Sequence, residues 1–333
     1  MNVLLTGGAG YLGSHTAVVL HNLGHDVVLL DNLSNSHPGV VDRLIEITGK
    51  SFPLFEADVR NTQQVRQILR NHRIDAVVHF AGLKAVSHSV QDPLGYYSNN
   101  VCGTLSLLEA MQAEGVKTLV FSSSATVYGE PESLPFQENH QTLPINPYGR
   151  SKLHSETVMQ DLVASDSSWR IICLRYFNPV GAHESALIGE NPAGVPNNLM
   201  PYIARVLSGQ MEVLNVFGND YPTRDGTGVR DYIHVMDLAD GHASALAFLQ
   251  AHQGWFAINL GSGEGLTVLE VVKSFERASQ KSIPYRFMPR RDGDIAEYYA
   301  DASYAFALMG WRAKRSIDCS CSSALRFQQN LAK

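Results

Sequence analysis

The chain has 333 residues, enough for one large domain or two modest ones, and its 44% apolar and 17% charged residues are typical of a globular protein. A net charge of −6 without a basic block argues against nucleic acid as a partner. No apolar run approaches the roughly 20 residues that span a bilayer, and the N-terminal residues enter a strand pattern without a signal peptide, so we expect no membrane association.

The cysteines and histidines lack the spacing of metal or redox motifs. Cys102, Cys173, Cys319 and Cys321 include no Cys-x-x-Cys, and the 13 histidines form no ligand cluster. The sequence therefore predicts no bound metal, and reduced thiols in a cytoplasmic location.

The first 31 residues follow the order strand, glycine turn, helix, strand, acid. The apolar run Asn2–Thr6 leads into Gly7-Gly-Ala-Gly-Tyr-Leu-Gly13, and a helical pattern and a second apolar run then end at Asp31. Glycines let the backbone approach a pyrophosphate, a helix N-terminus offers it free N–H groups, and the acid accepts hydrogen bonds from a ribose. An acid favours NAD over NADP, whose extra phosphate would meet a like charge. Asn32 and Asn35 could also reach the ribose.

Apolar runs then alternate with helical patterns as far as Tyr176. Strands are predicted at 52–56, 76–80, 117–122 and 170–175, and helices at 62–72, 93–114 and 148–164. This alternation predicts an α/β fold with a Rossmann-type, doubly wound parallel sheet, whose ligand lies outside the carboxyl ends of the strands. The residues at such ends are Asp31, Asp58, Phe80, Ser124 and Tyr176. Asp58 is equally compatible with a contact to adenine and with a helix cap.

The stretch 122–152 contains the residues that could perform chemistry. Tyr148 and Lys152 are four apart in a predicted helix, so the ammonium can lie near the phenol. A phenol titrates near pH ~10, and a neighbouring cation favours its charged form, which would make Tyr148 a general base closer to neutral pH. Ser124, after a predicted strand, would share the reacting proton.

Beyond Tyr176-Phe-Asn-Pro179 the composition shifts to Gly, Pro and Asn. The patterns predict a loop at 189–198, a short helix at 199–208 that Asn198 could cap, a strand at 229–235, a helix at 237–250, a strand at 255–260 and a capping box at Thr267-x-x-Glu270. Arg230, Arg290 and Arg291 lie in loop-like surroundings, where they could grip phosphates or be solvated surface residues.

In combination, these motifs resemble the extended short-chain dehydrogenase/reductase family, in particular its members that act on nucleotide sugars. The resemblance covers residues 1 to about 311 and rests on the glycine turn, Ser124 with Tyr148-x-x-x-Lys152, Tyr176-Phe-Asn-Pro179, Asn197-Asn-Leu199 and Arg230-Asp-Tyr-Ile-His234. It implies reversible epimerisation at C4 of UDP-glucose and UDP-galactose. Tyr148 would take the proton of the 4-hydroxyl while C4 passes hydride to a tightly held NAD, and the transient 4-keto sugar would then take the hydride from enzyme-bound NADH on its other face.

The resemblance also assigns site residues and domains. The cofactor would contact Gly7, Gly10, Tyr11, Leu12, Gly13, Asp31, Asn32, Asn35, Asp58, Val59, Phe80, Ala81, Lys84, Asn99, Ser122, Tyr148, Lys152 and Tyr176. The nucleotide sugar would contact Lys84, Ser124, Tyr148, Asn178, Asn198, Leu199, Asn215, Val216, Phe217, Arg230, Tyr232, Arg291, Asp294 and Tyr298. Residues 1–177 would form the NAD-binding domain, to which the chain returns at about 229–255, and residues 178–228 and 256–333 a smaller α/β substrate-binding domain.

Three further expectations follow from the resemblance. Tyr298 would lie beside the sugar 2-substituent and disfavour N-acetylated hexoses by its bulk. The family is usually a homodimer joined by a four-helix bundle, here through the helices around 100–111 and 153–163, although both apolar stripes could instead face their own sheet. After Asp318 weak helix formers put the packing of the last helix in doubt, and Cys321 is expected to be buried.

Four alternatives remain. A 4,6-dehydratase would need an acid and a base after the hydroxyl residue, where this chain has Ala125-Thr126. A 4-epimerase of N-acetylated hexoses would accept the larger sugar. A net dehydrogenase or reductase would change free NADH stoichiometrically. A non-catalytic NAD-binding protein on the same fold would lack the Ser, Tyr or Lys, and all three are present.

Overall fold

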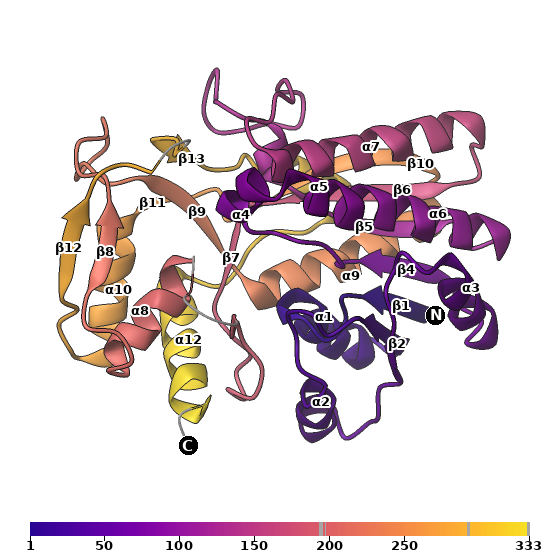
Figure 1. Ribbon diagram of the computed structural model, residues 1–333, viewed down its shortest axis with the longest axis horizontal. Coiled ribbons are helices and arrows are strands. Elements are labelled where there is room, and N and C mark those ends of the chain that lie inside the picture. The colour runs from indigo at the N-terminus through magenta and orange to yellow at the C-terminus, as the bar shows by residue number, and fades with distance from the viewer. Residues whose placement is uncertain (193–195, 197, 292–293, 332–333) are drawn as a thin grey trace.

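The computed structural model describes residues 1–192, 196, 198–291 and 294–331, and within them a seven-stranded parallel sheet forms the larger part of the molecule (Figure 1). Its strands are β1 (Asn2–Thr6), β2 (Asp26–Asp31), β3 (Leu54–Glu56), β4 (Ala76–His79), β5 (Thr118–Ser124), β6 (Arg170–Tyr176) and β10 (Gly254–Leu260). Their order is β10-β6-β5-β4-β1-β2-β3, with all neighbours parallel. This is the doubly wound order of dinucleotide-binding sheets, so the predicted fold class is confirmed.

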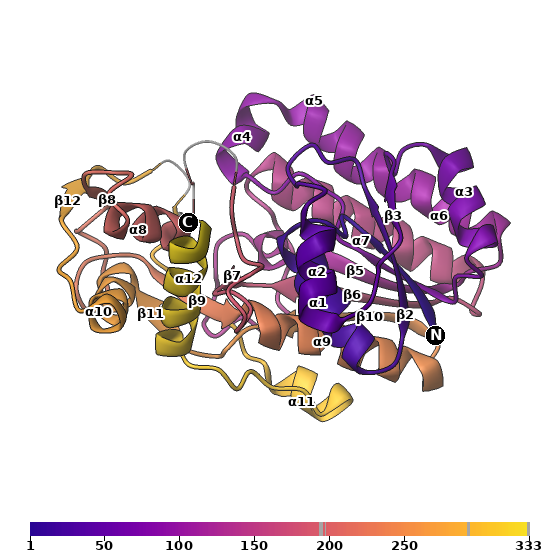
Figure 2. The same ribbon diagram turned by 90° about the horizontal axis from the view of Figure 1, so that it is seen from below.

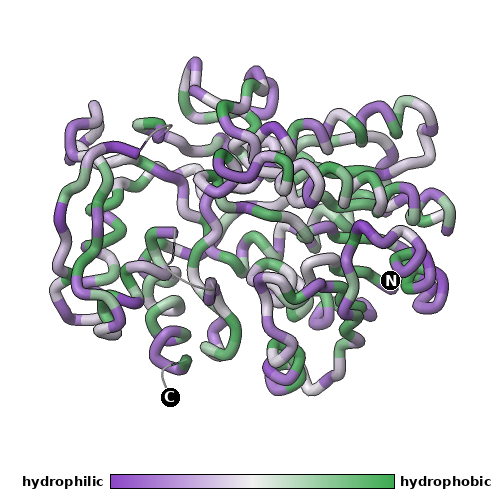
Figure 3. Tube along the Cα trace, viewed as in Figure 1, coloured by the Kyte–Doolittle hydropathy of each residue, from purple (hydrophilic) through white to green (hydrophobic). Residues whose placement is uncertain are grey.

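Helices cover both faces of this sheet (Figure 2). One face is covered by α3 (Thr62–Asn71), α6 (Gly103–Ala113) and α7 (Pro147–Ser165), and the other by α1 (Tyr11–Asn22), α2 (Val40–Thr48), α9 (Val235–Ala251) and α11 (Ser303–Met309). Because both sides of the strands are buried, their sequences are continuous apolar runs. Along the outer helices hydrophobic and hydrophilic residues alternate instead (Figure 3).

The second half of the chain builds a smaller unit beside the end of β6. Its strands are β7 (Asn178–Val180), β8 (Leu214–Phe217), β9 (Val229–His234), β11 (Gly265–Thr267), β12 (Tyr285–Met288) and β13 (Glu297–Tyr298), and its helices α8 (Leu199–Leu207), α10 (Val268–Ser279) and α12 (Ile317–Leu331). Strand β9 pairs with β7, β11 and β13, whereas β8 pairs with β12. Between β9 and β11 the chain returns to the large sheet through α9 and β10. The exact domain boundaries stay a prediction.

The helix predicted at 93–114 is not continuous. It consists of α5 (Pro93–Tyr96), a π-helical stretch at Tyr97–Cys102 and α6, and it follows the short helix α4 (Val86–Gln91). The wider π turn contains Asn99 and Asn100. The Asn100 amide accepts a hydrogen bond from the Leu83 backbone N–H at 2.8 Å and donates to the Leu83 carbonyl at 3.0 Å. Such π turns often occur at functional sites, and this one fixes the loop that follows β4.

The C-terminal helix packs well despite its weak helix formers. In α12, Cys321 is fully buried and Leu325 is 9% exposed, in a core shared with α8 and α10, as expected for Cys321. Its serines make one local and one distant hydrogen bond: Ser320 Oγ donates to the Ser316 carbonyl at 3.2 Å, and Ser323 Oγ accepts from the Ala182 N–H at 3.1 Å. The second bond ties α12 to the chain that leaves β7, and together with the buried core it compensates for the low helix propensity.

Two features of the described residues bear on membrane and metal binding. None of the helices found there combines the length and the apolar character that crossing a membrane requires. No group of three or more His, Cys, Asp or Glu side chains in the same part of the chain is arranged to hold a metal ion.

Candidate active site

The glycine turn joins β1 to α1 and leaves room for a ligand on one side. A Cβ at Gly7 would lie 2.8 Å from the Ala81 nitrogen, and one at Gly13 would lie 2.3 Å from the Gly7 oxygen, so side chains are excluded at both positions. At Gly10 an added Cβ would meet, among the described atoms, only the Gly7 oxygen at 3.2 Å. In the same residues α1 begins without a side-chain cap, so its first N–H groups are available to an anion.

Asp31 lies at the end of β2, next to this turn. Its carboxylate accepts hydrogen bonds from the backbone N–H groups of Ala9 and Leu33, both at 3.0 Å, and from Ser36 Oγ at 2.8 Å. Asn32 and Asn35 are exposed beside it. An open glycine turn, a free helix N-terminus and an oriented acid fit the pyrophosphate and a ribose of a dinucleotide.

Asp58 is not a helix cap. The N-cap of α3 is Asn61, whose side chain accepts a hydrogen bond from the Gln64 N–H at 3.1 Å. The Asp58 carboxylate instead pairs with Arg60 at 2.7 Å and accepts from Asn32 Nδ2 at 3.4 Å, and the hydrogen bonds from Arg60 lower its pKa to about 2. The cap alternative is therefore wrong, and the adenine contact of Asp58 and Val59 stays a prediction.

Ser124, Tyr148 and Lys152 come together where β5 ends and α7 begins. Asn146 caps α7 by accepting the Gly149 N–H at 2.8 Å, which places Tyr148 and Lys152 in the first turns of the helix. Lys152 Nζ donates to the Ser122 carbonyl oxygen at 2.6 Å and lies 6.0 Å from the centroid of the Tyr148 ring. The Ser124 side chain lies close enough to the Tyr148 phenol to lower its pKa.

The electrostatics of this group differ from the sequence expectation in two respects. Burial raises the pKa of Tyr148 above its ordinary value, and the smaller opposing effects of the Ser124 hydroxyl and of the Lys84 charge do not bring it closer to neutral pH. Burial also lowers the pKa of Lys152 to about 8. In addition, the charge of Lys84, on the loop after β4, favours the phenolate, while the Lys152 ammonium, 6.0 Å from the centroid of the Tyr148 ring, donates to the Ser122 carbonyl.

Tyr176, at the end of β6, is held by a residue that the sequence analysis missed. Its hydroxyl lies 2.5 Å from His242 Nε2, and His242 Nδ1 lies 2.8 Å from the Leu238 carbonyl oxygen. Because a carbonyl only accepts, Nδ1 must bear the proton and Nε2 must accept from the phenol. The Phe80 ring packs on the same imidazole, at 4.7 Å between centroids. His242 has only an ordinary helical spacing in the sequence.

A buried ion pair supports Lys152 from behind. Glu156, one helical turn further along α7, pairs with Arg175 at 2.6 Å, and their side chains are 1% and 5% exposed. Glu156 also accepts from Ser123 Oγ at 2.5 Å, and Arg175 donates to the Tyr128 hydroxyl at 3.0 Å. These bonds tie α7 to β5 and β6, so the direction of the Lys152 side chain is fixed. No motif in the sequence indicates this pairing.

The predicted phosphate ligands converge in the smaller unit. Arg291 Nε donates to Asp294 at 2.8 Å, and Arg230 Nη2 lies 3.7 Å from the same carboxylate. The Arg291 guanidinium stacks on Phe217 at 4.9 Å. On the adjacent strands Asn178 Nδ2 donates to the Asp231 carbonyl at 3.1 Å, opposite Tyr232 in the β7–β9 register. Asn215, also in the predicted set, accepts from Arg286 Nε at 2.7 Å.

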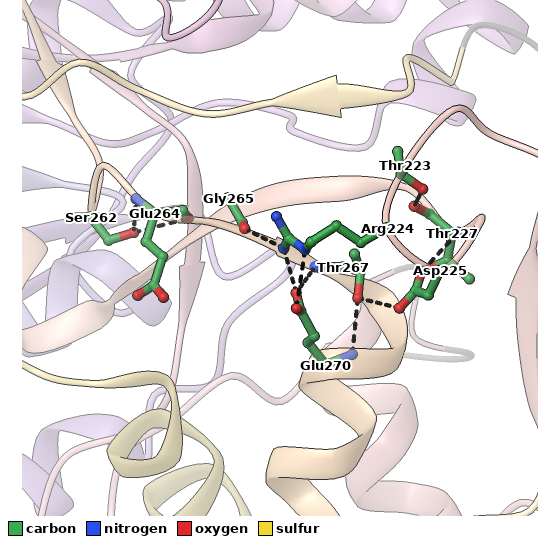
Figure 4. Close-up of polar contacts among 9 residues, drawn as sticks. All are labelled: Thr223, Arg224, Asp225, Thr227, Ser262, Glu264, Gly265, Thr267 and Glu270. Carbon is green, nitrogen blue, oxygen red and sulfur yellow. Dashed lines mark hydrogen bonds and ion pairs between the residues drawn. The ribbon is translucent and has the colours of Figure 1, made fainter.

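The loop before Arg230 is fixed by the N-terminus of α10 (Figure 4). Arg224 Nη2 donates to Glu270 at 2.6 Å and to the Gly265 carbonyl at 2.8 Å. Asp225 accepts the hydroxyl of Thr267 at 2.6 Å, and Thr267 and Glu270 form the predicted capping box. These hydrogen bonds hold the loop that precedes Arg230 in one conformation.

Tyr298 lies next to Arg230, with which it is paired in the β13–β9 register. Burial raises its pKa well above the ordinary value. Its ring packs against Phe136 at 4.8 Å and Phe177 at 5.3 Å. The buried hydroxyl has no hydrogen-bond partner in the described part of the chain.

Asn198 precedes α8, but its side chain does not cap the helix as expected. Asn198 Nδ2 donates to Glu190 at 2.7 Å, and Lys84 forms an ion pair with the same Glu190 at 2.9 Å. Glu190 is absent from the predicted set. Asn197, from the same motif, lies outside the described residues.

Comparison with known proteins agrees with this geometry. A family model described as GDP-mannose 4,6 dehydratase matches residues 4–323. The UDP-glucose 4-epimerase of Bacillus subtilis (strain 168) is 54% identical over 330 residues, covering 99% of this chain and 97% of the relative. The chain belongs to the UDP-glucose 4-epimerases of the extended short-chain dehydrogenase/reductase family.

Solved UDP-glucose 4-epimerases have the same fold. The crystal structure from Stenotrophomonas maltophila, with bound NAD and formylated UDP-arabinopyranose, is 49% identical with a TM-score of 0.98, over 100% of this chain and 99% of that one. The structure from Bifidobacterium longum, in complex with NAD+ and UDP, is 49% identical with a TM-score of 0.96, over 99% of this chain and 98% of that one.

The dehydratase chemistry named by the family model does not suit this site. Ala125 has no ionisable group, and the Thr126 hydroxyl donates to Ser124 Oγ at 2.9 Å. Neither can remove and donate the protons that loss of water requires. The residues after Ser124 therefore favour the epimerases within the family.

Proposed function

We propose that this protein interconverts UDP-glucose and UDP-galactose by reversible epimerisation at C4, using tightly bound NAD. The observation that supports this most directly is the meeting of Ser124, Tyr148 and Lys152 at the same edge of the sheet as the glycine turn and Asp31. The chain is about half identical to enzymes named for this reaction, and two solved relatives bind NAD together with a uridine nucleotide.

Bound NAD supplies an acceptor and donor of hydride at the sugar C4. Tyr148 takes the proton of the 4-hydroxyl, and Ser124, whose side chain lies near the phenol, shares that proton. Loss of both hydrogens leaves a 4-keto sugar. When hydride returns to the other face of the ketone, the same phenol gives the proton back to the oxygen, so the proton balance of the enzyme is unchanged.

The remaining predicted residues bind and orient. The glycine turn and the N-terminus of α1 hold the pyrophosphate, Asp31 with Asn32 and Asn35 the ribose, and Asp58 with Val59 the adenine. Phe80, Ala81, Asn99, Ser122 and Tyr176 line the rest of the cofactor site. Arg230 and Arg291 bind the diphosphate of the nucleotide sugar, while Asn178, Asn198, Leu199, Asn215, Val216, Phe217, Tyr232, Asp294 and Tyr298 contact uridine and hexose.

We also propose a homodimer that forms through α6 and α7. Leu105, Leu108, Val158 and Leu162 line a shallow groove of about 310 Å³ between these helices, and Leu105 is 39% exposed. An apolar groove between two long helices suits a second copy of the chain that is related by two-fold symmetry. A cytoplasmic location is consistent with four free cysteines in the described residues.

The decisive experiment mixes purified protein with UDP-galactose, adds no NAD, and follows UDP-glucose by chromatography. We expect conversion by the native protein and a loss of roughly 100-fold or more in Tyr148→Phe. Tyr304→Phe, at an exposed position, is the matched control and should leave the rate unchanged. No conversion even after NAD is supplied would contradict the proposal, and stoichiometric release of NADH would indicate a dehydrogenase instead.

A further inference from the structure

Glu190 lies between β7 and α8, and one of its carboxylate oxygens receives two hydrogen bonds. Lys84 Nζ donates to Oε1 at 2.9 Å, and Asn198 Nδ2 donates to the same atom at 2.7 Å. The side chain of Glu190 is only 10% exposed, whereas that of Lys84 is 51% exposed. The carboxylate is therefore a fixed acceptor, and Lys84 would be mobile without it.

The two donors come from opposite sides of the site. Lys84 follows β4 of the large sheet, and Asn198 begins α8 of the smaller unit. Beneath them lies the glycine turn: Lys84 Nζ is 5.9 Å from the centroid of the Tyr11 ring, and the Tyr11 hydroxyl donates to the Gly181 carbonyl at 2.7 Å. Glu190 thus connects Lys84, on the cofactor side, with Asn198, on the substrate side, close to the glycine turn.

A carboxylate is an unexpected neighbour for a diphosphate, because like charges repel. The position of Glu190 is explained if its role is to hold the Lys84 ammonium. Lys84 has a long flexible side chain, and holding such a chain in one conformation costs rotamer entropy that a partner must offset. Glu190 is that partner, and the pair also raises the pKa of Lys84 despite its desolvation, so the ammonium stays charged.

We propose that Glu190 is a positioning residue of the epimerase reaction, which holds the Lys84 ammonium within electrostatic reach of Tyr148 and keeps the Asn198 amide turned toward the same point. The inference rests on the proposed function and concerns a residue that touches neither reacting atom. Lys84 and Asn198 are two residues that we assign to the substrate, so one carboxylate orients the polar groups on both sides of the hexose.

The other ionisable groups near the pair do not replace this effect. Among the described residues, those that face Tyr148 are Tyr96, Lys152, Tyr176 and Tyr298, and Tyr11 faces Glu190 in addition to Lys84. Burial raises the pKa of each of these tyrosines, so they are neutral. The remaining cation, Lys152, donates to Ser122.

The direction of the expected change in the pH profile follows from the position of the Lys84 charge. Without the carboxylate, Lys84 regains its solvent conformers, its charge moves away from Tyr148 on average, and the pKa of Tyr148 rises. Because Tyr148 must be unprotonated to accept the proton of the sugar, the acid limb of kcat/KM then moves to higher pH. A residue needed only for folding would lower the rate at every pH and leave the limb in place.

The test compares Glu190→Ala, Lys84→Met and the double variant as holoenzymes. We expect both single variants to move the acid limb of kcat/KM to higher pH, Lys84→Met further, and the double variant to match Lys84→Met. A second readout does not depend on turnover: the phenolate absorbance of Tyr148 is titrated as the difference between each protein and its Tyr148→Phe counterpart. The midpoint should move in the same order.

Two further variants complete the design. Glu190→Gln keeps an oxygen that both donors can reach, so its acid limb and phenolate midpoint should move less than those of Glu190→Ala. Glu132→Ala, at an exposed glutamate, should leave the limb and the midpoint unchanged. An unmoved limb and midpoint in Glu190→Ala would overturn the proposal, as would an equal shift when Lys84 is already Met. A native protein without epimerase activity would count against the proposed function alone, because the phenolate titration would still report on Glu190.

Discussion

Lys152 donates a hydrogen bond to the carbonyl oxygen of Ser122 at 2.6 Å, across the space between α7 and β5. The same nitrogen lies 4.9 Å from the centroid of the Phe121 ring and 6.0 Å from that of Tyr148. The ammonium is therefore held between a strand and the proposed base, and its burial lowers its pKa to about 8.

This geometry predicts that the alkaline side of the pH profile depends on Lys152. A lowered pKa means that the amine loses its proton, and with it the charge, as pH rises through about 8, so the rate should fall above that value. Lys152→Met should lower the rate roughly 100-fold or more at all pH values and remove this limb. The exposed Lys281→Met serves as control, and an alkaline limb that persists in Lys152→Met would assign it to another group.

Arg230 is predicted to act in binding rather than in chemistry. Its side chain is 21% exposed and lies 3.7 Å from Asp294. Because a hydrogen bond to a charged group contributes about 1.5–3 kcal/mol, Arg230→Met should raise KM for UDP-glucose roughly 10- to 100-fold with a smaller change in kcat. Steady-state kinetics measures both. Arg277→Met removes the same charge from an exposed pair with Asp318 and should change neither constant; a fall in kcat alone for Arg230→Met would refute the assignment.

Tyr298 is predicted to limit the size of the sugar 2-substituent. Tyr298→Ala should raise turnover of UDP-N-acetylglucosamine relative to UDP-glucose, because it removes the ring that packs on Phe136 and Phe177. Tyr298→Phe is the matched control, since the hydroxyl lacks a hydrogen-bond partner among the described residues and the bulk is kept. Equal use of both substrates by the native protein would show that the ring excludes nothing.

Buried histidines should make the fold sensitive to mild acid. Burial lowers the pKa of His79 to about 3 and that of His242 to about 4, from an ordinary value near 6.5. As pH falls below about 6.5 the unfolded chain takes up protons that the folded protein refuses, so the free energy of unfolding decreases, by on the order of 1 kcal/mol per histidine and pH unit down to the folded pKa.

Thermal unfolding between about pH 7 and pH 5 tests this. His79→Gln, which can still bond Thr6 and Thr104, should show a smaller decrease in Tm over that range than the native protein. The exposed His37→Gln controls for loss of an imidazole as such. A decrease of the same size in His79→Gln and in the native protein would rule out a contribution from His79.

Local patterns in the sequence sufficed for much of the fold and of the cofactor side of the site. The glycine turn with Asp31, and Tyr148 with Lys152, are encoded within short stretches, because a turn and one helix face place them. The strands of the large sheet are buried on both sides and can therefore be recognised in the sequence as apolar runs. The short strands β8 and β12 are only four residues each and partly exposed, which leaves too few residues for a recognisable period.

The contacts that tune the site are of another kind. Glu190 meets Lys84 across 106 residues of sequence, and Tyr176 meets His242 across 66. Neither partner has a distinctive neighbourhood, so only the folded chain brings them together. The π turn at Tyr97–Cys102 is likewise invisible, because it changes the hydrogen-bond register of a helix without changing its apolar stripe.

The edge strand β10 has a consequence for how the protein is made. It pairs with β6 along Gly254–Leu260, and α9, which precedes it, covers one face of the sheet. A ribosome completes β6 at Tyr176 but must add β7, β8 and β9 of the smaller unit before α9 and β10 emerge. Until β10 is synthesised, β6 lacks a neighbouring strand on one side. The growing chain therefore exposes an unpaired, aggregation-prone sheet edge during that time. Fragments that stop near residue 177 would keep that edge permanently and should aggregate rather than bind nucleotide.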